Sequence, residues 1–111
     1  MTQRLALAAA IAFACAVPAV LAAAPAAKGF SVTVPIRNFA YMPMEVTVPV
    51  GGSVTWKNLD GEPHTVTSTD GAFGSGALDE GDSFSFRFTK AGTYPYICSI
   101  HPQMRAKVIV R

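Results

Sequence analysis

The sequence predicts an all-β fold, a β-sandwich of about seven to eight short strands. From about residue 30 onward, short runs in which apolar and polar residues alternate recur along the chain, and turn residues such as Gly, Pro and Asn separate them. This part of the chain shows no repeat of apolar residues at a helical period. The length of 111 residues leaves room for one domain.

Residues 1–26 have the layout of a secretory signal peptide. A short positive start containing Arg4 precedes an unbroken apolar run over residues 5–17, and Ala24-Pro25-Ala26 provides an A-x-A cleavage signature. We therefore expect an exported, periplasmic protein whose mature domain comprises residues 27–111. We expect no stable insertion of this domain into a membrane after cleavage.

Other interpretations of the N-terminal region stay open. A membrane anchor competes with the signal peptide, but the apolar run is shorter than the ~20 residues that span a bilayer. Pro18 would also interrupt a spanning helix. Cleavage after Ala22 or Ala23 is an alternative to cleavage after Ala26, and a lipoprotein signal ending at Cys15 is a further alternative.

The first half of the mature domain contains four predicted strands. Apolar and polar side chains alternate within them, and turns such as Pro49-Val50-Gly51-Gly52 separate them. Pro35 cannot donate to a β-ladder and therefore indicates an edge position for the first strand. Trp56 falls on the apolar side of its strand, so we expect it in the core rather than stacked on a ligand. The predicted strands of this half are 30–36, 46–48, 54–57 and 64–68, the last opened by His64.

The second half contains three further predicted strands. Phe84, Phe86 and Phe88 alternate with polar residues and give a strong strand signal. Residues 70–81, by contrast, hold four glycines and no periodicity, which predicts a surface loop. We expect the acidic residues at its end to be solvated. The predicted strands of this half are 83–88, 93–98 and 106–110.

Cys98, His101 and Met104 form the pattern C-x-x-H-x-x-M on one tight loop between the last two predicted strands. A soft thiolate and thioether together with an imidazole suit copper, particularly a site that must hold both Cu(I) and Cu(II). The sequence contains two histidines, so His64 is the other imidazole available as a fourth ligand. These four residues predict a site for one copper ion.

Each of these residues has an ordinary structural explanation when it is taken alone. Met commonly fills gaps in a core, and a free Cys behaves as a small buried hydrophobe. The ordered spacing, the loop between strands and the matching distant His favour a metal site. If Cys15 leaves with the signal peptide, Cys98 is unpaired in an oxidising compartment, and a bound metal is its simplest occupant.

Composition argues against a nucleic-acid-binding protein. Without Arg4, eight Lys and Arg face seven Asp and Glu, a formal charge of +1. A nucleic-acid binder would need a clustered basic face. We therefore expect no nucleic-acid partner.

The closed ligand set indicates electron transfer rather than catalysis. Four protein ligands leave no open position for substrate or water, which an enzyme acting on small molecules would need. We expect a one-electron carrier that is not an enzyme. Two alternatives stay open: a protein that stores or delivers copper, and a secreted binding module in which the same ligands hold structural zinc.

The mature chain resembles the cupredoxins, small blue copper proteins, over essentially its whole length. The resemblance rests on Val54-Thr55-Trp56, Pro63-His64-Thr65-Val66, the run from Ala91 to Cys98, and the run from His101 to Val108. Within the family, the two-residue gaps on either side of His101 are similar to those of amicyanin, whereas plastocyanin and pseudoazurin have a longer gap before the Met.

The resemblance implies a Greek-key β-sandwich with one type 1 copper ion near one end. It implies that His64, Cys98 and His101 are equatorial ligands, that Met104 is the weak axial ligand, and that His101 approaches the surface. It also implies redox partner proteins that dock transiently near His101. We expect the protein itself to be a monomer.

Three residues near the predicted ligands carry further expectations. Met42 and Met44 are expected to pack near the site rather than to bind the metal. Thr65 stands where amicyanin has Asn, and its hydroxyl can both donate and accept a hydrogen bond. We therefore expect Thr65 to tie the two ligand-bearing loops together.

Overall fold

The computed structural model describes residues 29–111. The predicted signal peptide and Cys15 lie outside the described residues. The described part of the chain contains no helix that is long and apolar enough to cross a membrane. Its strands are β1 (Ser31–Arg37), β2 (Ala40–Tyr41), β3 (Glu45–Val48), β4 (Ser53–Asn58), β5 (Thr67–Ser68), β6 (Ser83–Arg87), β7 (Gly92–Ile97) and β8 (Arg105–Val110).

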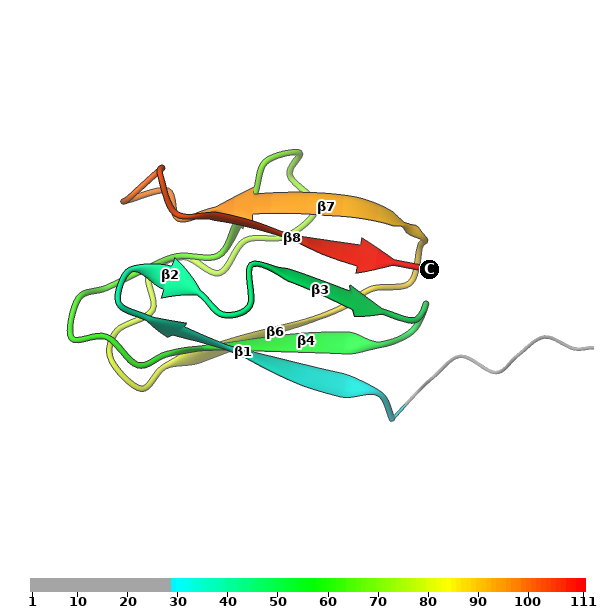
Figure 1. The fold of residues 1–111 in the computed structure, drawn as a ribbon, viewed down its shortest axis with the longest axis horizontal. Coiled ribbons are helices and arrows are strands. Elements are labelled where there is room, and N and C mark those ends of the chain that lie inside the picture. The colour runs from blue at the N-terminus through cyan, green and yellow to red at the C-terminus, as the bar shows by residue number, and fades with distance from the viewer. Residues whose placement is uncertain (1–28) are drawn as a thin grey trace, which may run out of the picture.

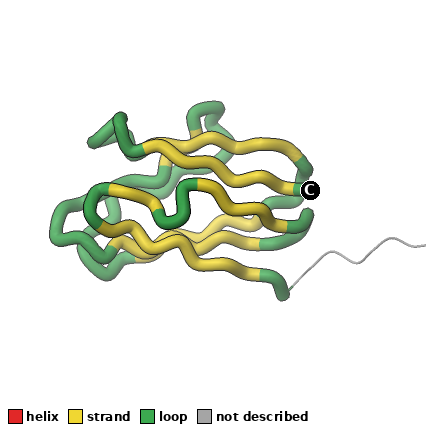
Figure 2. The backbone as a smooth tube through the Cα atoms, in the orientation of Figure 1, coloured by secondary structure: helices red, strands yellow, loops and turns green. Residues whose placement is uncertain are grey.

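The eight strands form two sheets of four that pack face to face (Figures 1 and 2). One sheet has the order β2-β1-β4-β6 and the other β3-β8-β7-β5. The pairs β1–β4 and β3–β8 are parallel, so the chain crosses between sheets before it returns beside an earlier strand. The predicted all-β sandwich is therefore confirmed, with eight strands among residues 29–111.

The core lies between the sheets and is built on Trp56. Its ring is fully buried and stacks on Phe73 and Phe84, with centroids 5.6 and 5.8 Å away. The indole N–H donates to the hydroxyl of Tyr96 at 3.0 Å, so the one polar atom of the side chain is satisfied. Burial raises the pKa of Tyr96 to about 12 and keeps this hydroxyl neutral. The expected core role of Trp56 is confirmed.

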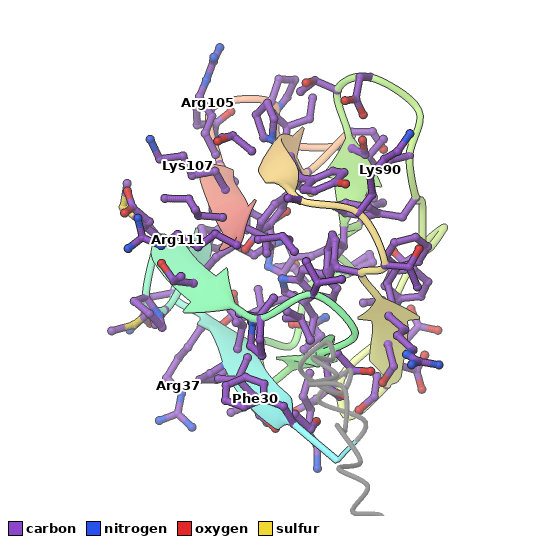
Figure 3. The ribbon with its side chains drawn as sticks, turned by 90° about the vertical axis from the view of Figure 1, so that its right-hand side faces the viewer. Phe30, Arg37, Lys90, Arg105, Lys107 and Arg111 are labelled. Carbon is purple, nitrogen blue, oxygen red and sulfur yellow. The ribbon has the colours of Figure 1, made fainter. Side chains whose placement is uncertain are left out.

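β1 meets the expectation drawn from Pro35. It pairs with β4 along its length and with β2 only at Ile36 and Arg37, so most of β1 has an open edge. In the other sheet, β8 carries exposed basic side chains, and Lys107 Nζ lies 3.6 Å from Glu45 Oε1 on β3. Figure 3 shows Arg105 and Lys107 projecting from β8 away from the core, with Arg111 directly after the strand.

Two loop predictions need correction. The segment 70–81 is not only a surface loop, because Phe73 and Leu78 point inward and are buried in the core. Leu78 also exchanges two backbone hydrogen bonds with His64, at 2.7 and 3.1 Å. His64 therefore sits in an isolated bridge, and the strand that follows it is only Thr67–Ser68 rather than 64–68.

The expectation that Met42 and Met44 pack near the site is wrong. Their side chains are 51% and 63% exposed. The interior beside this segment is filled by Tyr41, which is buried and contacts Tyr96 edge-to-face with ring centroids 4.7 Å apart. Both Met residues follow in the connection between β2 and β3, whose backbone turns their side chains to solvent.

Tyr41 anchors the loop that carries His64, and we expect Tyr41→Phe to destabilise the metal-free protein. The Tyr41 hydroxyl donates to the Thr65 carbonyl at 2.5 Å in a buried position. Burial, with Cys98 and Tyr96 nearby, raises the pKa of Tyr41, so the hydroxyl stays a donor. Removing it leaves a buried carbonyl unpaired, which should lower the free energy of unfolding by about 1–3 kcal/mol.

Denaturant unfolding measures this effect, and Tyr94→Phe is the matched control. The Tyr94 hydroxyl also donates to a backbone carbonyl, that of Lys90 at 2.6 Å, but at an exposed position where water can replace it. The control should cost less than about 1 kcal/mol. Equal losses for the two variants would contradict the anchoring role of Tyr41.

Candidate metal centre

The predicted ligands gather at one end of the sandwich. Cys98, His101 and Met104 lie in the β7–β8 loop, and His64 lies in the segment between β4 and β5. Both segments are at the left end in Figure 1, opposite the C-terminus. Residues 34 positions apart in sequence, His64 and Cys98, are thus brought together by the packing of the two sheets.

The β7–β8 loop is held tight by its own backbone. The His101 N–H donates to the Cys98 carbonyl at 3.1 Å, and the Met104 N–H donates to the His101 carbonyl at 2.9 Å. The Cys98 N–H in turn donates to the Met104 carbonyl at 3.1 Å and closes the loop. The first two bonds each span one step of the C-x-x-H-x-x-M pattern and the third spans the whole pattern, so the spacing of the donors is also the spacing of the turns.

Three donor atoms converge as a metal site requires. Cys98 Sγ lies 3.9 Å from His64 Nδ1 and 3.7 Å from His101 Nδ1, and the three donors lie within 4.8 Å of one another. Sulfur and nitrogen bound to one ion at about 2.0–2.3 Å are about 3.5–4 Å apart. The donor set therefore fits a first-row metal, and one thiolate with two imidazoles is the set that type 1 copper uses.

Burial differs between the two histidines as expected. His64 and Cys98 are fully buried and Met104 is almost so, whereas His101 is only half-buried. His101 is therefore the predicted ligand nearest to solvent. Met104 is buried at the end of the same loop.

Thr65 joins the two ligand-bearing segments, as predicted. Its hydroxyl accepts the Ser99 N–H at 2.8 Å and lies 3.1 Å from the Ser99 hydroxyl. Its own N–H points at Cys98 Sγ at 3.3 Å. An N–H donated to the sulfur withdraws charge from a bound thiolate and is one of the contacts that tune such sites.

Asp60 contacts the predicted ligand His64, a contact that the sequence did not predict. Its Oδ2 lies 2.8 Å from His64 Nε2, and its side chain is only 12% exposed. With Nε2 engaged by the carboxylate, Nδ1 is left as the metal-binding nitrogen and faces Cys98. The signal was an Asp four residues before the predicted ligand, in the polar connection 58–63 between two predicted strands.

The environment of Asp60 favours its ionised form. Partial burial alone would raise the pKa of the carboxyl, but hydrogen bonds from the N–H groups of Phe39 and Asn38 and from His64 outweigh it and lower the pKa below its usual value.

Buried Asn58 shapes the same loop. Its side-chain amide donates to the Glu62 and Leu78 carbonyls at 2.9 Å, and its side-chain oxygen accepts the Asp60 N–H at 2.9 Å.

Comparison with known proteins shows which family has this fold and this set of donors. The sequence model of the cupredoxin-like domain matches residues 5–110. The chain belongs to the cupredoxin family. This cupredoxin is similar to amicyanin from Paracoccus denitrificans, with 42% identity over 94 residues that cover 80% of the chain and 71% of that protein. Amicyanin-alpha from Methylorubrum extorquens is 34% identical over 116 residues, covering 91% and 98%.

Solved structures agree with the sequence relatives. A reduced Cu(I) form of an amicyanin variant at pH 4 superposes with a TM-score of 0.69 at 35% identity, covering 73% of this chain and 82% of that one. A purple cupredoxin from Nitrosopumilus maritimus gives 0.67 at 34% identity, covering 72% and 99%. The expected resemblance to amicyanin and the expected copper cofactor are therefore confirmed, and the relatives support a cupredoxin electron carrier.

Proposed function

We propose that this cupredoxin is an exported, periplasmic carrier of single electrons with one type 1 copper ion. In this proposal residues 1–26 are the signal peptide, residues 27–111 are the mature domain, and the ligands are His64, Cys98, His101 and Met104. The observation that carries it is the convergence of one cysteine sulfur and two imidazole nitrogens within 4.8 Å, at a site where all but one predicted ligand is buried.

The residues around the site favour electron transfer over catalysis. Copper bound by such donors alternates between Cu(I) and Cu(II) and so stores one electron. Asp60 fixes His64, and Thr65 fixes the loop of Cys98 through Ser99, so the donors keep their places in both oxidation states. Buried ligands that fill the coordination sphere leave no position for a substrate, which argues against an enzyme.

Electron exchange needs a partner close to the metal, and His101 offers the shortest route. It is half-buried while the other predicted ligands are shielded. Its neighbours in the loop, Ile100 and Pro102, are exposed and uncharged, as is Pro63 next to His64. Such a rim suits brief docking of redox proteins, since weak electron-transfer contacts are small. We propose that partners dock here and that the carrier acts as a monomer.

Met104→Leu tests the assignment of the axial ligand. A weak, long thioether bond affects the reduction potential more than it affects metal affinity. The variant should keep its copper and show a higher potential, because loss of the thioether destabilises Cu(II) more than Cu(I). A tenfold change in the relative affinity for the two states corresponds to about 59 mV, so we expect an upward shift of this order.

Protein-film voltammetry on the copper-loaded protein measures the shift. Met104→Gln should move the potential in the opposite direction, because an amide oxygen is a harder ligand that favours Cu(II). Loss of copper from Met104→Leu under conditions where the parent retains it would show that Met104 is misassigned.

Storage or delivery of copper is the second candidate function. The observation that favours it is the partial exposure of His101, through which an acceptor protein could reach the ion. A delivery protein passes its Cu(I) to a copper-free acceptor on contact, whereas a carrier gives up the electron and keeps the metal.

A further inference from the structure

The turn between β1 and β2 has an unusual backbone. Arg37 pairs with Ala40, so Asn38 and Phe39 alone form the turn, and both have positive φ, 55° and 57°. Two-residue hairpin turns of this kind favour Asn followed by Gly. Asn38 fits the rule, but Phe39 places a large side chain where Gly is preferred.

Burial of the side chain does not explain why position 39 is Phe rather than Gly. Its side chain is 46% exposed, so it adds little to the hydrophobic core. A residue held in a sparsely populated backbone region without a packing gain indicates a functional constraint. The contacts of the Phe39 ring indicate what this constraint is.

Asp60 holds this turn in place. One carboxylate oxygen accepts the Asn38 N–H at 2.7 Å, and the other accepts the Phe39 N–H at 2.9 Å. The second oxygen also lies 2.8 Å from His64 Nε2. A single carboxylate therefore joins the strained turn to a predicted metal ligand.

The Phe39 ring contacts both predicted histidine ligands. Its centroid lies 5.0 Å from that of His64 and 5.0 Å from that of His101, with interplanar angles of 83° and 89°. The two imidazoles are 5.1 Å apart at 63°. Such separations and near-perpendicular angles are those of favourable edge-to-face aromatic pairs.

The two histidines differ in what else restrains them. His64 is fully buried and its Nε2 is held by Asp60. His101 is half-buried, and within residues 29–111 the one hydrogen-bonding partner recorded for its side chain is Cys98 Sγ. The His101 ring also packs against two aromatic side chains, His64 and Phe39, and Phe39 is the one that is not itself a predicted ligand.

We propose that Phe39 is a positioning residue whose ring, held in place by Asp60, fixes the orientation of the His101 imidazole toward the metal. This inference rests on the proposed function, because it requires copper bound by these histidines. It adds a residue that neither binds the metal nor belongs to either ligand-bearing segment.

Phe39→Leu removes the ring and keeps an apolar side chain at the turn. The affinity for Cu(II), measured by competition with a chelator, should fall by about tenfold, as for other residues that orient metal ligands. The EPR spectrum of the Cu(II)-loaded protein should broaden in its copper hyperfine lines, because His101 then adopts a range of orientations. Phe30→Leu is the control: Phe30 is 42% exposed and precedes β1 at the other end of that strand (Figure 3).

Two further variants separate positioning from a merely structural role. Phe39→Gly removes the ring and the backbone strain together, so the copper-free protein should unfold at or above the temperature of Phe39→Leu while its EPR spectrum is equally broadened. Asp60→Asn releases the turn and should broaden the spectrum in the same way, with Glu62→Gln as a control for loss of one charge in the same loop. The combined loss of copper affinity in Asp60→Asn/Phe39→Leu should be smaller than the sum of the two single losses, because part of the effect of Asp60→Asn passes through the Phe39 ring.

The outcomes are distinct. An unchanged EPR spectrum and copper affinity in Phe39→Leu, or equal changes in Phe30→Leu, would overturn the positioning role while leaving the proposed function standing. A parent protein that binds no copper would overturn the proposed function itself. Broadened EPR spectra in the Phe39 and Asp60 variants, with unchanged spectra in the controls Phe30→Leu and Glu62→Gln, would support the inference.

Discussion

Replacing Cys98 with serine should abolish the intense visible colour of the Cu(II)-loaded protein and leave the sandwich folded. The colour of a type 1 site comes from charge transfer between a thiolate and Cu(II), and a hydroxyl is a harder ligand that does not supply it. Cys98 is the sulfur donor that lies 3.9 and 3.7 Å from the two imidazole nitrogens, so no other residue replaces it there. Serine is close to cysteine in size, so the copper-free protein should lose only about 1 kcal/mol of stability.

Absorption spectra of the copper-loaded parent and variant measure this effect. Ser99→Ala is the matched control, because it alters the adjacent residue and its hydrogen bond to Thr65 but keeps the thiolate. The control should remain coloured. A Cys98→Ser variant that keeps the full visible band would rule out the thiolate as a ligand.

Replacing His64 with alanine should disrupt the site far more than replacing His101. His64 is fully buried, and its loss leaves a cavity and removes a partner from Asp60. The copper-free protein should lose about 2–5 kcal/mol of stability, as for other large-to-small changes in a core. His101 is half-buried, so His101→Ala should cost less than about 1 kcal/mol.

Added imidazole distinguishes the two positions further. At His101 the vacated space opens toward solvent, so free imidazole can enter and restore the visible band of the Cu(II) protein. At His64 the space is enclosed and the surrounding loop is destabilised, so imidazole should not restore it. Equal rescue at both positions would contradict the burial difference on which the proposed docking site rests.

The fold and the predicted ligands were accessible from sequence because their signals are local. Alternation predicts strands such as β4 and β6, and the C-x-x-H-x-x-M pattern places three donors on one loop. With two histidines in the chain, His64 followed by elimination. The burial of His64 followed from its place at the start of a structured segment after a loop.

Thr65 apart, the residues that hold the ligands could not be predicted from sequence, because their partners are distant along the chain. Asp60 accepts hydrogen bonds from Asn38 and Phe39, which lie 22 and 21 positions away. No pattern within residues 58–63 predicts that contact. Leu78 reaches the core only because its backbone pairs with that of His64. Met42 and Met44 were misplaced because composition gives no direction for side chains in an irregular connection.

Anaerobic titration of the Cu(II)-loaded protein with a reductant, in the presence of a Cu(I) chelator, tests the central claim most directly. We expect the visible band to disappear with one electron per copper and to return fully on reoxidation, and we expect the copper to stay with the protein throughout. Buried Cys98, His64 and Met104 are the reason to expect retention. Transfer of the copper to the chelator on reduction, or a band that does not return, would contradict an electron carrier and favour copper delivery.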